Sequence, residues 1–152
     1  RSTRMKKPYT YIFNIEGNQE KPEGNPIGYK RVLNHSMRAD GVRYMEWQQH
    51  VRSIFFDRTG EYEKKGNKFG PPIKLLRGQW ARMDLHIVWK DETHGDPDNI
   101  FKGIADSLFA NDKELAGSFE FEHGKKGMVY VSIWISEPGE KVGSSQLNSH
   151  GP

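Results

Sequence analysis

Acidic and basic side chains recur at regular intervals in the middle of the chain. Asp98, Lys102 and Asp106 are spaced four residues apart, so on a helix they would share one polar face. Asp96 precedes this series, and Asp112 follows it after a short connection. Carboxylates that converge repel one another unless a cation lies between them. Mg²⁺ suits such a place, because it takes oxygen ligands from one or two carboxylates and keeps waters that can attack a phosphate ester. The pattern therefore indicates metal-dependent phosphodiester chemistry.

The same residues also have a purely structural interpretation. Asp96 suits the N-cap of a helix, Pro97 suits its first position, and Asp98 would be favourable near the positive end of the helix dipole. Lys102 could form a simple salt bridge with Asp98 one turn earlier. From the pattern alone, both interpretations stay open.

The charge of the chain is unevenly distributed. The 152 residues carry 23 Lys and Arg against 20 Asp and Glu, a net charge of +3. Residues 91–122 contain nine acidic residues and two lysines, a net −7, so the remainder of the chain carries +10. A basic body around one acidic island favours a polyanion-binding surface beside a cation site, although an unevenly charged soluble surface gives the same numbers. Cysteine is absent, which excludes disulfides, a cysteine nucleophile and thiolate-bound zinc.

Hydrophobic periodicity predicts the elements that must position these residues. Alternating apolar residues predict strands, and apolar residues at three- and four-residue spacing predict helices. The expected elements, in chain order, are a strand at 9–16, a helix at about 40–58, a strand at 81–89, a helix at 96–108, and a hairpin of 117–122 and 128–135 around the turn 123–127. The segments 18–29 and 61–72 are expected to be loops, the first because it contains two prolines and two glycines.

This order predicts an α+β fold, with a mostly antiparallel or mixed sheet packed against two helices in a single domain. The domain is expected at 5–136, followed by a disordered tail at 137–152 that is rich in Gly and Ser. Residues 1–4, which precede Met5, are interpreted as a remnant outside the domain. We expect a cytoplasmic protein without membrane contact, because no apolar run approaches the ~18 residues of a span and no signal peptide is recognisable.

The order of acidic and basic residues resembles the RusA family of Holliday-junction resolvases. The family pattern Asp-x-Asp-Asn-x-x-Lys reads Asp96 to Lys102 here, and it is followed by Asp106 and by the pair Asn111-Asp112. The part from the first aspartate to Asp106 is fairly specific, whereas the match of the predicted strands and helices is general. The resemblance covers about residues 9–135.

The resemblance implies a homodimeric, Mg²⁺-dependent endodeoxyribonuclease, encoded by a bacterium or a phage, that resolves four-way DNA junctions by paired nicks. Mn²⁺ would be able to substitute for Mg²⁺. Asp96, Asp98 and Asp112 correspond to the metal ligands and Lys102 to the catalytic lysine. Asp106 matches a further family carboxylate, either a metal ligand or a local support.

Several basic residues are candidates for contacting DNA phosphates. These are Lys30, Arg31, Arg38 and Arg43, together with His94 just before the acidic series. Ordinary solubility is the alternative for the four cations, and a solvated turn is the alternative for the histidine. Two other functions also fit the sequence, namely a non-catalytic nucleic-acid-binding protein and a Mg²⁺-dependent phosphoesterase acting on another nucleic acid.

The position of Asp112 depends on how the chain leaves the second helix. From Asp98 to Leu108 the helix rises about 15 Å. The four residues from Leu108 to Asp112 span at most about 13–14 Å. The family's corresponding stretch is longer. Asp112 therefore reaches Asp98 only if the chain doubles straight back, and otherwise it meets Asp106.

Overall fold

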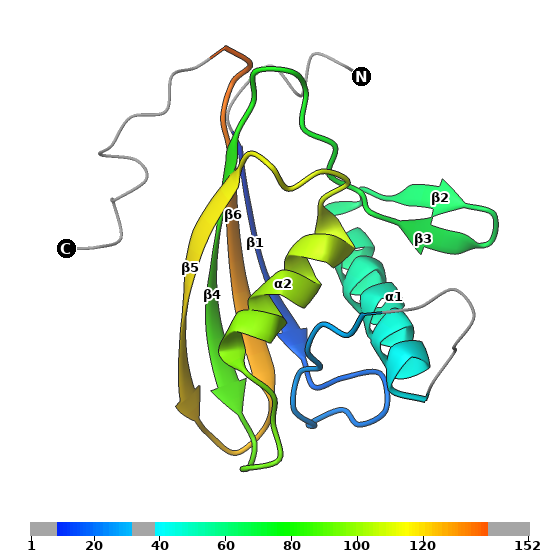
Figure 1. The fold of residues 1–152 in the computed structure, drawn as a ribbon, viewed down its shortest axis with the longest axis vertical. Helices are drawn as coiled ribbons and strands as arrows, with labels where there is room; N and C mark the ends of the chain where they lie inside the picture. The colour runs from blue at the N-terminus through cyan, green and yellow to red at the C-terminus, as the bar shows by residue number, and fades with distance from the viewer. Residues whose placement is uncertain (1–8, 32–38, 140–152) are drawn as a thin grey trace.

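Two helices cover one face of a four-stranded mixed sheet, and a small two-stranded sheet lies beside them (Figure 1). The computed structural model describes residues 9–31 and 39–139, so the predictions for residues 1–4 and for the tail beyond residue 139 lie outside the described residues. The elements are β1 (Tyr9–Glu16), α1 (Ala39–Thr59), β2 (Glu63–Lys65), β3 (Lys68–Gly70), β4 (Ala81–Trp89), α2 (Pro97–Leu108), β5 (Leu115–His123) and β6 (Met128–Ile135). The predicted α+β class, with a mixed sheet against two helices, is confirmed.

The strand order in the main sheet is β1-β6-β4-β5. β6 is antiparallel to both of its neighbours, and Ile135 is aligned with Tyr9 on one side and with Ala81 on the other. β4 and β5 are parallel, starting together at Ala81 and Leu115. A parallel pair needs a crossover, and α2 provides it by carrying the chain from the end of β4 back to the start of β5.

The core lies between the helices and the sheet, as the apolar periodicity predicts. Every second residue of β4 is buried, while α1 and α2 each bury one face. The buried residues of these elements include Met83, Leu85, Ile87 and Trp89 from β4, Tyr44, Trp47, Val51 and Phe55 from α1, and Ile100, Ile104 and Leu108 from α2. Among the described residues, no helix is long and apolar enough to cross a membrane.

The predicted hairpin of the last two strands is wrong. β5 and β6 do follow each other around a turn, but β4 lies between them and pairs with both. Alternation of side chains fixes which face of a strand is buried, and it does not say which strand lies next to it.

Residues 61–72 contain an element that periodicity missed, because the strands β2 and β3 pair there as a short antiparallel hairpin. Lys65 is aligned with Lys68 across the two-residue turn Gly66-Asn67, in which Gly66 has a φ of 64°. Glycine at the first position of a two-residue turn is a known hairpin signal.

Candidate functional site

The two acidic residues at the start of α2 are exposed. Asp96 occupies the N-cap with an extended backbone, and its carbonyl accepts hydrogen bonds from the amides of Asn99 and Ile100 at 3.0 and 3.1 Å. Its carboxylate makes no side-chain capping bond, and Asp98 lies in the first helical turn. The capping interpretation therefore holds for the position of Asp96 and not for its side chain. Both carboxylates remain available to a ligand.

Lys102, one turn further along α2, packs against an aromatic ring. Its ammonium group lies 4.2 Å from the centre of the Tyr29 ring, a distance at which a cation and the ring's π face attract each other. The Tyr29 amide donates to the Asn99 carbonyl at 3.0 Å, which fixes this loop against α2. Within the part of the chain that the structure describes, no ion pair of 4.0 Å or less joins Lys102 to Asp98.

Asp106 lies half-buried where α2 contacts α1. The Tyr44 hydroxyl donates to its carboxylate at 3.5 Å and accepts a hydrogen bond from Gln48 at 3.2 Å. Burial raises the pKa of Asp106, and the negative charge of Asp112 raises it further, while the positive charge of Lys102 opposes both. Burial likewise raises the pKa of Tyr44. The spacing of apolar residues does not predict the contact of the Tyr44 hydroxyl with Asp106, which is a structural finding.

Asp112 lies beyond the other end of α2. After Leu108 the chain continues in extended form at Phe109 and pairs with Ile73 instead of doubling back along the helix. The Ile73 amide donates to the Leu108 carbonyl, and the Ala110 amide donates to the Ile73 carbonyl, each at 2.9 Å. Because β5 runs parallel to β4, it must start at the end of the sheet opposite Asp96. The twelve residues of α2 span about 18 Å. The structure therefore places Asp112 near Asp106 and apart from Asp96 and Asp98.

A cleft of about 550 Å³ opens beside the acidic pair, and we call it the α2 cleft. Three segments line it, namely the loop 18–30, the start of α1 and the turn 90–95 with Asn99 of α2. Its charged lining residues are Lys21, Lys30, Arg43, Lys90, Glu20, Asp40, Asp91 and Glu92. The cleft therefore presents cations to a ligand next to Asp96, although acids are mixed among them.

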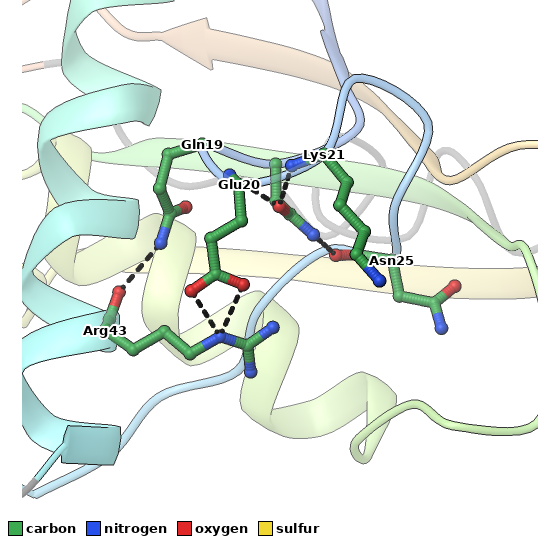
Figure 2. A network of polar contacts seen from close by, with 6 residues as sticks. Gln19, Glu20, Lys21, Asn25 and Arg43 are labelled. Carbon is green, nitrogen blue, oxygen red and sulfur yellow. Dashed lines mark hydrogen bonds and ion pairs between the residues drawn. The ribbon is translucent and has the colours of Figure 1, made fainter.

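A polar network holds the loop wall of the α2 cleft in place (Figure 2). The Asn18 side chain donates to the Asn25 carbonyl at 2.6 Å and accepts from the Glu20 amide at 2.8 Å. The Arg43 guanidinium of α1 pairs with the Glu20 carboxylate at 2.9 Å, and Gln19 donates to the Arg43 carbonyl at 3.1 Å. These contacts tie the loop to α1 and give the cleft a defined wall.

The residues predicted to contact DNA have different environments. Lys30 and Arg31 are exposed, and Lys30 lines the α2 cleft. Arg43 is engaged with Glu20, and half-buried His94 lines the cleft. Arg38 lies outside the described residues. Their contact with DNA stays a prediction.

One group that sequence reasoning missed lies next to the acidic pair. Glu92, His94 and His123 place one ligand atom each within 4.8 Å of one another, and among the described residues this is the only such group of three or more acidic or histidine side chains. Asp96, Asp98 and Asp112 do not form one. The wrong hairpin prediction placed His123 in a turn, whereas it ends β5 beside Trp89 of β4.

The chain matches no protein-family model, and the search of curated proteins also gave no match. The resemblance to the RusA family therefore rests only on the motif from Asp96 to Lys102 with Asp106 after it.

Proposed function

We propose that this protein is a Mg²⁺-dependent endonuclease that resolves four-way DNA junctions. The observation that carries the proposal is the exposed pair Asp96 and Asp98, which lies after the end of β4 and beside the α2 cleft, with Asp98 one turn before Lys102. An acidic pair that can hold a cation and neighbouring cationic side chains that can contact phosphates are the two parts that hydrolysis of a polyanion requires.

The donor set fits Mg²⁺. The ion commonly binds through one or two protein carboxylates and completes its shell with water and phosphate oxygens, so Asp96 and Asp98 suffice without Asp112. The carboxylate of Asp96 makes no capping bond, and both side chains reach solvent. When bound there, the ion would activate a water molecule and polarise the scissile phosphate.

Lys102 would act on the phosphate by charge. Packing on Tyr29 holds the ammonium near the polar face of α2, and a cation–π contact leaves its N–H donors available to an oxygen ligand. A donated hydrogen bond to a non-bridging phosphate oxygen would stabilise negative charge that develops in the transition state.

The basic residues of the α2 cleft would hold the DNA backbone. Lys30 and Lys90 line the cleft, and contacts of this kind position a nucleic acid without reading its bases. Selectivity would then follow the shape of the junction. A two-fold dimer would present two such sites and would give paired nicks.

The test compares labelled four-way junctions with linear duplexes of the same sequence, with Mg²⁺ or with EDTA. Asp98→Asn is expected to reduce Mg²⁺-dependent nicking by about 100-fold or more, because loss of the ion removes several kcal/mol of transition-state stabilisation. Glu114→Gln, an exposed change near the start of β5, is the matched charge control and should retain activity.

Asp112→Asn tests whether Asp112 is a metal ligand together with Asp96 and Asp98, as the family resemblance implies. Because Asp112 lies at the far end of α2, this variant should keep most of the activity. A loss equal to that of Asp98→Asn, in a folded protein, would place Asp112 among the ligands.

Two outcomes would contradict the proposal in different ways. Junction binding without Mg²⁺-dependent nicking would favour a non-catalytic nucleic-acid-binding protein. Equal cutting of junctions, linear duplexes and RNA would favour a less selective phosphoesterase.

A further inference from the structure

Three potential metal ligands meet where the parallel strands β4 and β5 end. Glu92 and His94 belong to the turn that follows β4, and His123 is the last residue of β5. The register aligns His123 with Trp89, and the amide of Gly124 donates to the Trp89 carbonyl at 2.8 Å. The backbone therefore holds the turn and the strand end together.

The ring of His94 is fixed in both plane and proton position. It stacks on the buried Trp89 indole, with ring centres 3.9 Å apart and planes 8° apart. Its Nδ1 lies 2.8 Å from the Gly95 carbonyl oxygen. A carbonyl oxygen only accepts, so in the neutral imidazole Nδ1 carries the proton and Nε2 keeps a lone pair. Histidines that bind metals are characteristically arranged this way, with one nitrogen donating to a carbonyl and the other free to ligate.

The other two groups complete a compact donor set. His123 Nε2 lies 3.5 Å from Glu92 Oε2, and the rings of His94 and His123 are 5.6 Å apart between centres. Ligand atoms about 2.1 Å from a tetrahedral zinc ion lie roughly 3.4 Å from each other. The three ligand atoms, all within 4.8 Å of one another, need only small side-chain movements to reach this spacing.

We propose that Glu92, His94 and His123 bind a transition-metal dication of the Zn²⁺, Co²⁺ or Ni²⁺ class. Two imidazoles and one carboxylate form a donor set of intermediate softness that these metals prefer, and it leaves a coordination position open to water or an oxyanion. Mg²⁺ prefers oxygen ligands, so this site differs in metal class from the acidic pair. The proposal does not rest on the nuclease function.

His86 differs from His94, because a carboxylate lies beside each of its two ring nitrogens. Its Nδ1 lies 3.3 Å from Glu120 and its Nε2 lies 2.5 Å from Glu122, so both nitrogens serve as donors. Hydrogen bonding to Glu122 raises the pKa of His86, which favours the protonated form. A protonated imidazole has no lone pair for a metal. His86 is therefore the matched control for the proposed site.

A metal ion here would also change the α2 cleft. Glu92 and His94 line that cleft, so a bound dication would add positive charge to a wall that now carries acidic side chains. The open coordination position would give an oxyanion such as phosphate a direct ligand.

The test is a titration of untagged protein with Zn²⁺ by calorimetry and with Co²⁺ by its visible absorption. We expect one tight ion per chain and no competition from millimolar Mg²⁺. His94→Ala and His123→Ala should each weaken binding by at least about 10-fold, since removing even a partner that only orients a ligand costs that much. Glu92→Gln, a change at an exposed turn residue, should weaken binding without disturbing the fold.

His86→Ala should bind as the unchanged protein does, and every variant retains His35 and His150, so their contribution to binding stays constant. The proposal is overturned if His94→Ala and His123→Ala bind normally, if His86→Ala loses as much affinity, or if Mg²⁺ displaces the ion. Circular dichroism of each variant confirms that the comparison is between folded proteins.

Discussion

At the scale of single residues, the surroundings of Asp106 disfavour the charged form of its carboxyl group. Burial and the neighbouring Asp112 both raise its pKa in the folded protein. An unfolded aspartate titrates near 3.9. Because its pKa is higher in the folded state, Asp106 binds its proton more tightly there than in the unfolded chain. The protonated group therefore stabilises the fold at low pH, and this contribution is lost as the pH rises through the folded pKa. At neutral pH the charged carboxylate is therefore a net cost to the fold.

Replacing Asp106 with asparagine should remove that cost. Asp106→Asn keeps the shape and an acceptor for Tyr44, so we expect it to stabilise the protein at pH 7, by less than about 1 kcal/mol because solvent screens a half-buried carboxylate. The gain should shrink as the pH falls toward 4 and Asp106 takes up its proton. Urea unfolding at the two pH values measures this. A loss of stability that is the same at both values would contradict the assignment.

The sequence predicted which residues of the candidate site are polar and exposed, because helix spacing and the start at Pro97 are local properties. It could not place Asp112, since that position depends on β5 pairing with β4 in parallel. It also missed the grouping of Glu92 with His123, which are distant in the chain and meet only through that pairing. Local patterns thus predicted the start of α2 and not the contacts between elements.

At the scale of elements, β5 depends on close backbone contact with β4. A Cβ built on Gly117 would lie 1.9 Å from the Met83 carbonyl oxygen, too close for any side chain. Gly117→Ala must therefore shift the strand, and we expect a loss of about 1–3 kcal/mol in unfolding free energy.

The matched control is Gly95→Ala, because nothing lies within 4 Å of a Cβ built there. This change should be neutral or slightly stabilising, since it restricts the unfolded chain. Chemical denaturation of both variants gives the comparison. Equal stability of the two would mean that β5 does not lie as closely against β4 as described.

The elements themselves were largely predictable. The strands at 9–16 and 81–89 and both helices appear within a residue or so of their expected limits, because strong periodicity over many residues reflects burial of one face. β5 was harder to predict, since only two of its nine residues are even partly buried. Its neighbour on the sheet is β4, which precedes α2 in the chain. Its place at the sheet edge follows from the crossover and not from its own residues.

At the scale of the whole molecule, the proposed function predicts that the affinity for DNA falls as the salt concentration rises, because Lys and Arg side chains neutralise phosphates. Neutralising Lys30 and Arg31 together should weaken junction binding and make the slope of log K against log salt shallower by about 1 for each phosphate that is no longer neutralised. Lys113→Gln, beside Asp112 at the far end of α2, is the control and should leave the slope unchanged. An unchanged slope in the double variant would remove these residues from the DNA-binding surface.

The position of β6 has a consequence for how the chain folds. β6 is the last strand in the sequence but an inner strand of the sheet, and its buried residues Val129, Val131 and Ile133 contribute to the core between β1 and β4. β1 and β4 therefore have no shared partner until nearly all of the described chain has left the ribosome. Pairing Tyr9 with Ile135 also closes one of the longest possible loops, and such non-local contacts slow folding. Until then, the nascent chain exposes apolar strand faces, so this is the stage at which it is most exposed to aggregation.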